Sequence, residues 1–297
     1  MVDFRLYSLI KIAETGSYTK AAELLSLSQP AVSQHIRQLE EQLDIVIFEH
    51  AHNRFSLTPE GEIVLKYARR MVALENNMLQ KLKNEREQIR SLNVGITHTA
   101  ESSTIIEALA AYFEPFGDLN MKILTNVTDN LYTMLKNYEI DFAFVDGRIS
   151  DPDLKYRMLD TDCLVLAVPP QHPLSSRSMV TLDQLRKERL ILRLPDSSTR
   201  KLFTASLQSQ GLMMRDFNIA MEIDSIASIK ELIRNGFGVS VLAKSACAGE
   251  LKKGTLKTLS IENMSMMREI SIACHRDFEH QDMLEGIVHM YNEIQNR

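Results

Sequence analysis

Apolar residues recur at helical spacing three times within the first 43 positions. The first series consists of Leu6, Leu9, Ile10 and Ala13. The second consists of Ala21, Ala22, Leu24 and Leu25, and the third of Val32, Ile36, Leu39 and Leu43. Gly16 can end the first helix, and Ser17 can cap the second. The pattern predicts three short helices before residue 44.

The third of these segments, SQPAVSQHIRQL, carries a second regular face. Gln29, Ser33 and Arg37 recur at i, i+4 and i+8, away from the apolar face. Ser28 is a plausible N-cap, and Pro30 suits the first turn, where free backbone amides can meet a phosphate. By itself this segment favours an ordinary amphipathic surface helix, and a helix that reads nucleic acid is the alternative.

Residues 45–57, IVIFEHAHNRFSL, form two short β-prone runs around a polar centre. Their pattern predicts a hairpin, or wing. The third helix, with its second polar face, is called the presented helix below. Two helices, the presented helix and a wing follow one another in the order of a winged helix-turn-helix.

After Gly61 no Pro or Gly interrupts the chain until Gly95. The apolar residues of this stretch follow 3-4-3-4 spacing at Val64, Tyr67, Met71, Leu74 and Met78, and more loosely at Leu82 and Ile89. Such spacing predicts a long helix with a coiled-coil seam. We expect it to dimerise, since the preceding segment is too short to cover it; a packed core helix and an exposed linker are the alternatives.

From residue 91 onward, short apolar runs alternate with helical stretches. The runs are LNVGI, MKILTN, DFAFVDG, CLVLAVP, LILRLP, NIAMEI and VSVLAK. Helices are expected over 105–113, 131–135, 199–210 and 226–234. This alternation predicts βαβ units and a parallel sheet, whose ligands collect at the carboxyl ends of the strands.

Composition and charge narrow the function. The 297 residues are 44% hydrophobic and 25% charged, which suits two or three compact units. The net charge is −5, and acidic residues outnumber basic ones within residues 1–60. One copy should therefore bind DNA weakly, through few well-placed cations. Dimerisation would strengthen the binding, because two copies contact the DNA together.

Features of other protein classes are weak or missing in the sequence. No apolar run is long enough for a membrane span, and the start lacks a signal-peptide pattern, so we expect a cytoplasmic protein without a membrane partner. Cys163, Cys247 and Cys274 show no CxxC spacing, which favours reduced thiols over a disulfide framework and leaves a redox-sensing pair as an alternative.

We also expect neither catalysis nor a cofactor. The acidic cluster DFAFVDGRISDPD is typical of a strand end and turn, and Cys274-His275 with a distant His280 is not a closed metal-ligand set. The chain contains no GxxxxGK[ST], GxSxG or HExxH motif. The sequence therefore predicts no enzyme and no metal site.

At this point the chain resembles the LysR-type transcriptional regulators over its whole length. The likeness lies in GSYTKAAELLSLSQPAVSQHIRQLEEQL and in IFEHAHNRFSLTPEGE. It implies a winged helix-turn-helix, a linker helix that dimerises, and a two-lobed α/β effector domain like the periplasmic binding proteins, often in a tetramer. The expected domains are 1–60, 61–90 and 91–297, with the first lobe at about 91–161 and 267–297 and the second at about 162–266.

The resemblance also implies roles for the presented helix on double-stranded promoter DNA. We expect Gln29, Pro30 and Ser33 at or near base edges, because Gln can pair with adenine, Pro can meet a thymine methyl, and Ser can hydrogen-bond to a base edge or to a phosphate. The residues expected to position the DNA backbone are Ser28, Gln34 and Arg37.

The wing departs from the family pattern. His50 stands where Arg is usual, and His52-Asn53 replaces a common Gly-Arg pair, whereas Arg54 is kept. We expect His50 and Arg54 to contact phosphate. The wing should bind phosphate more weakly than the usual family pattern does, and this binding should strengthen below pH ~6.5, where imidazole becomes charged. The alternative is that these histidines are neutral wing residues.

In the effector domain, the resemblance places polar residues after the strands. The expected effector-binding residues are Thr97, His98, Thr99, Asn126, Thr128, Ser197, Ser198 and Thr199. Hydroxyls and amides at helix N-termini favour a small carboxylate or other oxyanion, although the same residues can simply cap helices. Arg200 either touches the ligand or holds a lobe together.

The sequence thus predicts a DNA-binding regulator controlled by a small-molecule effector. A DNA-binding protein that ignores ligands and, less well supported, a solute-binding receptor are the alternatives. The sequence leaves open the effector, the promoters, activation or repression, and a dimer or tetramer.

Overall fold

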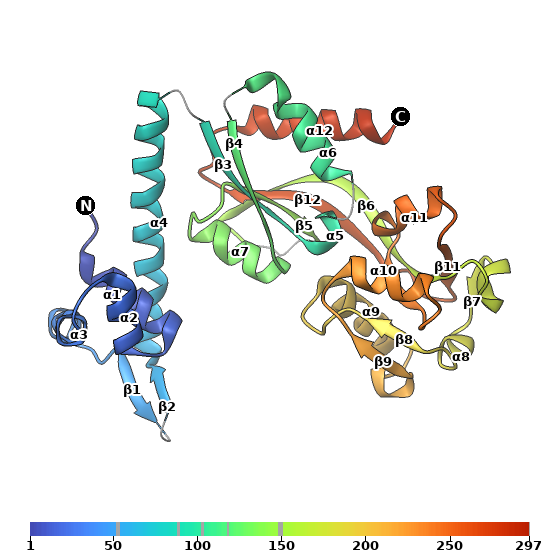
Figure 1. Cartoon of the computed structure of the whole chain (residues 1–297), viewed down its shortest axis with the longest axis horizontal. Helices are drawn as coiled ribbons and strands as arrows, with labels where there is room; N and C mark the ends of the chain where they lie inside the picture. Colours follow the sequence, from blue (N-terminus) through green and yellow to red (C-terminus); the bar gives the residue numbers. More distant parts are fainter. Residues whose placement is uncertain (52–53, 88–89, 102–103, 118, 148–150, 297) are drawn as a thin grey trace. The chain divides into compact units, whose positions relative to one another are not determined.

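The computed structural model describes residues 1–51, 54–87, 90–101, 104–117, 119–147 and 151–296 (Figure 1). Residues 1–90 make up one compact unit, and residues 91–135 with 140–297 make up a second. In the described part of the chain, no helix has the length and apolarity needed to cross a membrane.

The first unit begins with the three predicted helices. They are α1 (Phe4–Thr15), α2 (Tyr18–Leu25) and α3 (Gln29–Leu43). Their N-caps are Asp3, Ser17 and Ser28, each of which accepts a backbone N–H two or three residues ahead. Local capping thus starts each helix where the sequence pattern expects it.

The predicted hairpin and long helix follow. Strands β1 (Phe48–Ala51) and β2 (Arg54–Leu57) pair antiparallel, and α4 spans Pro59–Glu87. The expected hairpin tip, His52 and Asn53, lies outside the described residues. The core of this unit combines the apolar faces of the helices, with Leu9, Ile12, Val32, Ile36 and Ile47 almost wholly buried.

Gly61 lets the start of α4 pack against the segment before the wing. A Cβ at this position would lie 2.2 Å from the backbone oxygen of Ile47. We expect Gly61→Ala to destabilise this unit by about 1–3 kcal/mol, the usual cost of overpacking, because a backbone atom has to move. Urea unfolding measures the loss; Gly249→Ala, where the added carbon meets nothing within 4 Å, is the control. Equal midpoints for the two variants would contradict this account.

The second unit consists of two lobes, each a sheet covered by helices. The elements of the first lobe are β3 (Arg90–Ile96), α5 (His98–Glu101), α6 (Ile105–Phe113), β4 (Leu119–Thr125), α7 (Thr128–Lys136), β5 (Phe142–Asp146) and α12 (Gln281–Gln295). Apolar residues of α6 and α12 pack together in one cluster, and those of α7 form another with β5.

The second lobe is built from shorter elements. They are β7 (Met179–Val180), α8 (Leu182–Leu185), β8 (Leu190–Leu192), α9 (Ser198–Ser209), β9 (Ile219–Glu222), α10 (Ile226–Arg234), β10 (Ser240–Ala243), α11 (Ala248–Lys252) and β11 (Lys257–Ile261). Its main core gathers Leu166, Leu190, Phe203 and Val241.

Two long strands connect the lobes. β6 (Leu154–Val168) pairs with β12 (Met267–His275) in the first lobe and with β10 and β11 in the second (Figure 1). The strand predicted from CLVLAVP is thus only the second half of β6. Its first half is partly exposed, so its sequence lacks a continuous apolar run.

The sheet is mixed, whereas the sequence pattern predicted a parallel one. β3 and β5 are parallel, as are β8 and β9, but β12 lies antiparallel between β5 and β6. Antiparallel neighbours need no crossover helix between them, so the helix-strand alternation carries no signal for β12. This strand brings residues from late in the chain to the junction of the two lobes.

Candidate DNA-reading helix and interlobe site

Helix α3 buries one face and exposes another, as predicted. Val32, Ile36 and Leu39 are buried, whereas Leu43, the last residue of the predicted apolar face, is 44% exposed. The predicted contact residues Ser28, Gln29, Pro30, Gln34 and Arg37 are exposed, and Ser33 is half-buried. Because Gln29 Nε2 donates to Ser33 Oγ at 2.8 Å, the two side chains lie together, and the amide keeps its carbonyl for another donor.

His35, which the sequence analysis did not single out, anchors α3 to α1. Its Nδ1 lies 2.8 Å from the hydroxyl of buried Ser8, and its ring packs edge-on against Phe4. This contact sets the orientation of the exposed face. In the wing, His50 lies opposite Phe55, and Arg54 begins β2.

The predicted seam of α4 is largely uncovered within one chain. Tyr67, Met71, Leu74, Met78 and Leu82 are each about half exposed, at 44% to 53%. An apolar row of this length on one side of a helix is typical of a surface that a partner covers. In contrast, Glu75 accepts hydrogen bonds from the Tyr7 hydroxyl and the Val2 amide, which attach the middle of α4 to α1.

The first lobe contributes residues from two strand ends. Thr97 and Thr99 are buried, and Thr97 Oγ1 accepts the Ala100 amide at 3.3 Å. Asn126 Oδ1 accepts from its neighbour Val127 and from Asn130. Thr128, the first residue of α7, has a buried hydroxyl without a hydrogen-bond partner among the described residues.

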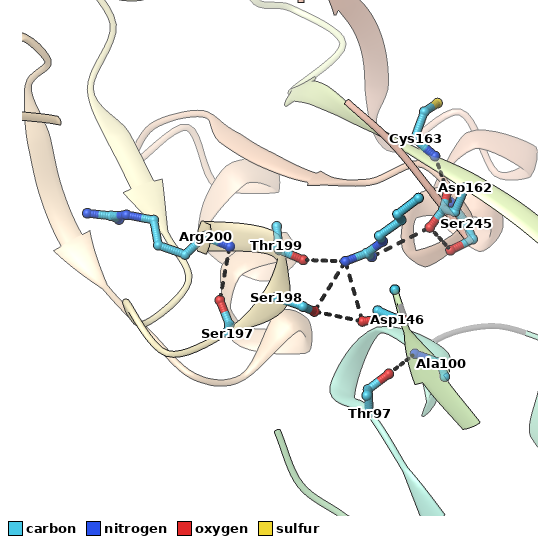
Figure 2. A network of polar contacts seen from close by, with 12 residues as sticks. Thr97, Ala100, Asp146, Asp162, Cys163, Ser197, Ser198, Thr199, Arg200 and Ser245 are labelled. Carbon is cyan, nitrogen blue, oxygen red and sulfur yellow. Dashed lines mark hydrogen bonds and ion pairs between the residues drawn. The ribbon is translucent and has the colours of Figure 1, made fainter. Parts of the chain in front are cut away.

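The second lobe contributes the start of α9. Ser197 caps this helix by accepting the Arg200 amide, and it also donates to Leu194, which occupies its hydroxyl. Ser198 donates to Asp146 of the first lobe at 2.9 Å. Figure 2 shows the Arg200 side chain directed away from Ser198; it donates to Glu222 and the Arg193 carbonyl, which supports a role within this lobe.

A buried ion cluster lies where these elements meet. Arg268, on β12, lies 3.4 Å from Asp146 at the end of β5 and 3.7 Å from Asp162 on β6. Its Nη1 also approaches the hydroxyls of Ser198 and Thr199 at 3.3 and 3.4 Å. The cluster therefore joins both lobes and both connecting strands through charged groups shielded from water.

The sequence analysis missed Asp146, Asp162 and Arg268 as site residues. Asp146 had a usable signal, because it ends a buried strand where ligands of such sheets collect. Arg268 had none, since only the antiparallel return of β12 brings it to the other two.

One exposed pair and one partly exposed pair bridge the lobes beside this cluster. Lys201 of α9 lies 2.7 Å from Asp129 of α7, and His98 lies 3.2 Å from Asp224, which also accepts from Arg193. Burial lowers the pKa of the Arg193 guanidinium below its ordinary value, and its ion pair with Asp224 opposes that shift. Of the predicted effector residues, the structure thus brings His98, Ser198 and Thr199 to partners across or between the lobes.

The cysteines have the environment of structural thiols. Burial raises the pKa of Cys163 and Cys274 above the ordinary value, and it raises the pKa of Cys247 to about 12. Because the thiolate is the reactive form, these shifts disfavour a redox-sensing role. The described residues contain no group of three His, Cys, Asp or Glu side chains that could hold a metal ion.

Comparison with known protein families gives two matches that together span most of the chain. Residues 5–62 match the bacterial regulatory helix-turn-helix proteins of the lysR family, and residues 85–293 match the LysR substrate binding domain. The second match alone covers more than half of the chain.

Individual proteins agree with this assignment. A probable RuBisCO transcriptional regulator of Phaeodactylum tricornutum is 30% identical over 98% of both chains. The HTH-type transcriptional regulator CysL of Bacillus subtilis is 27% identical, over 90% of this chain and 88% of its own.

Solved structures show the same fold. CbnR, a LysR family transcriptional regulator, superposes with a TM-score of 0.67 at 20% identity over 99% of both chains. Full-length OxyR of Pseudomonas aeruginosa gives 0.65 at 20% identity, over 98% of this chain and 95% of its own. The relatives thus share a helix-turn-helix unit followed by a two-lobed α/β domain. The chain belongs to the LysR family of DNA-binding transcriptional regulators and carries the family's effector-binding domain.

Proposed function

We propose that this regulator reads promoter DNA with α3 as a dimer joined through α4, and that a small carboxylate or other oxyanion bound between the lobes controls it. The observation that carries the DNA-binding part is the polar face of exposed Gln29, half-buried Ser33 and exposed Arg37, which lies beside the buried apolar residues Val32, Ile36 and Leu39. A structure of full-length CbnR in complex with its target DNA, with a TM-score of 0.66, supports this use of the fold.

Dimerisation supplies what a single acidic unit lacks. One copy offers few cations to the phosphates, and two copies double the contacts along the DNA. The half-exposed seam residues of α4 provide an apolar surface for this association. The family resemblance suggests further assembly into a tetramer.

The junction of the lobes suits an anion that is held mainly by neutral groups and one guanidinium. Ser198, Thr199 and Arg268 meet at the N-terminus of the twelve-residue helix α9. A ligand that prefers one arrangement of the lobes shifts the population toward it, which changes the spacing of the paired DNA-binding units. Equal effector affinity with and without bound operator would contradict this coupling.

Substitutions on α3 test the DNA contacts. We expect Gln29→Ala to cost about 1–3 kcal/mol of operator affinity and to relax the preference at one base pair, because Gln reads adenine through paired hydrogen bonds. Arg37→Ala should weaken binding to all sequences about equally and reduce the salt dependence. The measurement is binding to the operator and to its single-base variants at several salt concentrations.

Gln38→Ala is the matched control for this experiment. Gln38 is exposed on the opposite side of α3 from Gln29, nine residues along the helix, and its loss should leave affinity unchanged. If Gln29→Ala binds every base variant as the wild type does, Gln29 does not read a base.

Thermal unfolding of the full chain against a panel of small metabolic acids tests the effector. A selective ligand should raise the unfolding temperature by several degrees, since it stabilises only the folded state. Ser198→Ala and Thr99→Val should diminish this shift if both hydroxyls serve the ligand. No shift with any acid, combined with intact operator binding, would favour a regulator that acts without such a ligand.

A further inference from the structure

Buried polar atoms of the ion cluster lack partners. The side chains of Asp146 and Arg268 are 1% and 5% exposed. Even so, Asp146 Oδ1 and the Nε and Nη2 atoms of Arg268 make no hydrogen bond to any described residue. Buried polar groups are normally satisfied, because an unpaired one loses its bond to water without replacement. These atoms can therefore form hydrogen bonds to a molecule from outside the chain.

The unpaired atoms are of opposite kinds. Asp146 Oδ1 is an acceptor on an acid, and Nε and Nη2 of Arg268 are donors on a base. The 3.7 Å between Nη2 and Asp162 Oδ2 is an ion-pair distance, too long for a hydrogen bond. A ligand that carries only an anionic group can bond only to the unpaired donors. A ligand that carries only a cationic group can bond only to the unpaired acceptor.

The cluster also has too little positive charge for its carboxylates, and the shortage is greatest at Asp146. Two carboxylates share the one guanidinium of Arg268. Asp162 has three further donors, namely the Ser245 hydroxyl at 2.7 Å and the amides of Ser245 and Cys163. Among the described residues, in contrast, Asp146 receives one hydrogen bond, from the Ser198 hydroxyl (Figure 2). Asp146 is therefore the group that most needs an additional cationic donor.

We propose that the effector is a small zwitterion whose ammonium group donates to Asp146 Oδ1 and whose carboxylate accepts from Arg268 and the start of α9. α-Amino acids are the simplest members of this class. The inference rests on the proposed function and specifies the chemistry of its ligand. A plain carboxylate would add negative charge beside an acid that already lacks a donor, which low polarity makes costly.

Pairs of ligands that differ only in the amino group test this inference directly. Isothermal titration calorimetry of the full-length wild type at pH 7 compares the proteinogenic amino acids with their desamino acids, such as alanine with propanoate and glutamate with glutarate. At least one amino acid should bind, and about tenfold or more tightly than its desamino partner, which corresponds to a charged hydrogen bond.

The variant Asp146→Asn locates the effect. It keeps the size of the side chain and removes its charge, so the amino acid should bind about as weakly as its desamino partner. Asp183→Asn, on the exposed α8 and 86% exposed, is the matched control and should leave both affinities unchanged. The comparison of ligand pairs on the wild type is decisive by itself, even if Asp146→Asn fails to fold.

The outcomes separate this inference from the proposed function. Desamino acids that bind as tightly as their amino partners would overturn the zwitterion and leave an oxyanion effector standing. No binding by either class, with intact operator binding, would overturn the zwitterion and, with it, a small carboxylate as the effector; water would then fill the unpaired sites.

Discussion

Arg268→Met should lower the unfolding free energy of the effector domain by about 3–5 kcal/mol, the usual cost of removing one partner from a buried ion pair. The methionine fills similar space but leaves Asp146 and Asp162 as two buried carboxylates without a counter-charge. Urea unfolding, with hydrogen exchange of the β12 amides to assign the transition to this domain, measures the loss.

Two comparisons sharpen the Arg268 prediction. Arg157→Met breaks the exposed pair with Glu285 and should cost less than about 1 kcal/mol. Adding Asp146→Asn to Arg268→Met should recover part of the stability, because the two residues are in contact and their effects are not additive. A loss for Arg268→Met no larger than that for Arg157→Met would show that the cluster does not support the fold.

Leu74→Glu should convert the dimer into monomers and weaken operator binding by roughly a hundredfold or more. Leu74 is 47% exposed in one chain and lies in the middle of the seam, so two copies of the charge would meet in a twofold contact. Burying unpaired charge costs several kcal/mol, which outweighs what one apolar helix pair contributes locally.

Analytical ultracentrifugation and operator binding at matched concentrations measure this effect. Asn76→Glu introduces the same side chain on the opposite, exposed side of α4 and should leave the assembly intact. If Leu74→Glu sediments as the wild type does, α4 does not hold the dimer together.

The contacts at the lobe junction suggest how a small ligand can control the domain. The exposed pair Lys201–Asp129 contributes little to the free energy that holds the lobes together, because water and salt screen it. Removing one partner of the buried cluster costs more, because it leaves an uncompensated buried charge, and part of the cluster's hydrogen bonding is unsatisfied. A ligand that completes the cluster in one arrangement of the lobes supplies the differential affinity that a switch requires.

Prediction from sequence succeeded best in the first unit. The boundaries of α1, α2 and α3 follow from caps and from apolar spacing within each helix, which are local features. In the effector domain, helices over 105–113 and 226–234 were also predicted at their observed bounds. The helices predicted from residues 131 and 199 begin earlier, at Thr128 and Ser198, because polar first-turn residues carry little periodic signal.

Among the candidate effector residues, a local role could be expected from the sequence, whereas a contact with the other lobe could not. The hydroxyl of Ser197 is occupied as the cap of α9, a use that the sequence suggested as an alternative to ligand binding. Ser198 is the next residue, yet its hydroxyl crosses to Asp146 in the other lobe. Adjacent positions in one motif thus differ in role, because their side chains leave the helix in different directions.

The sequence by itself determined the order of elements in the first unit, the exposed polar face of α3 and the seam of α4, since these depend on spacing within one segment. Only the tertiary structure decided that Arg268 lies between Asp146 and Asp162. These residues come from β12, β5 and β6, and antiparallel pairing of distant strands brings them together. Such a site leaves no local pattern, because the interactions that define it join segments that are far apart along the chain.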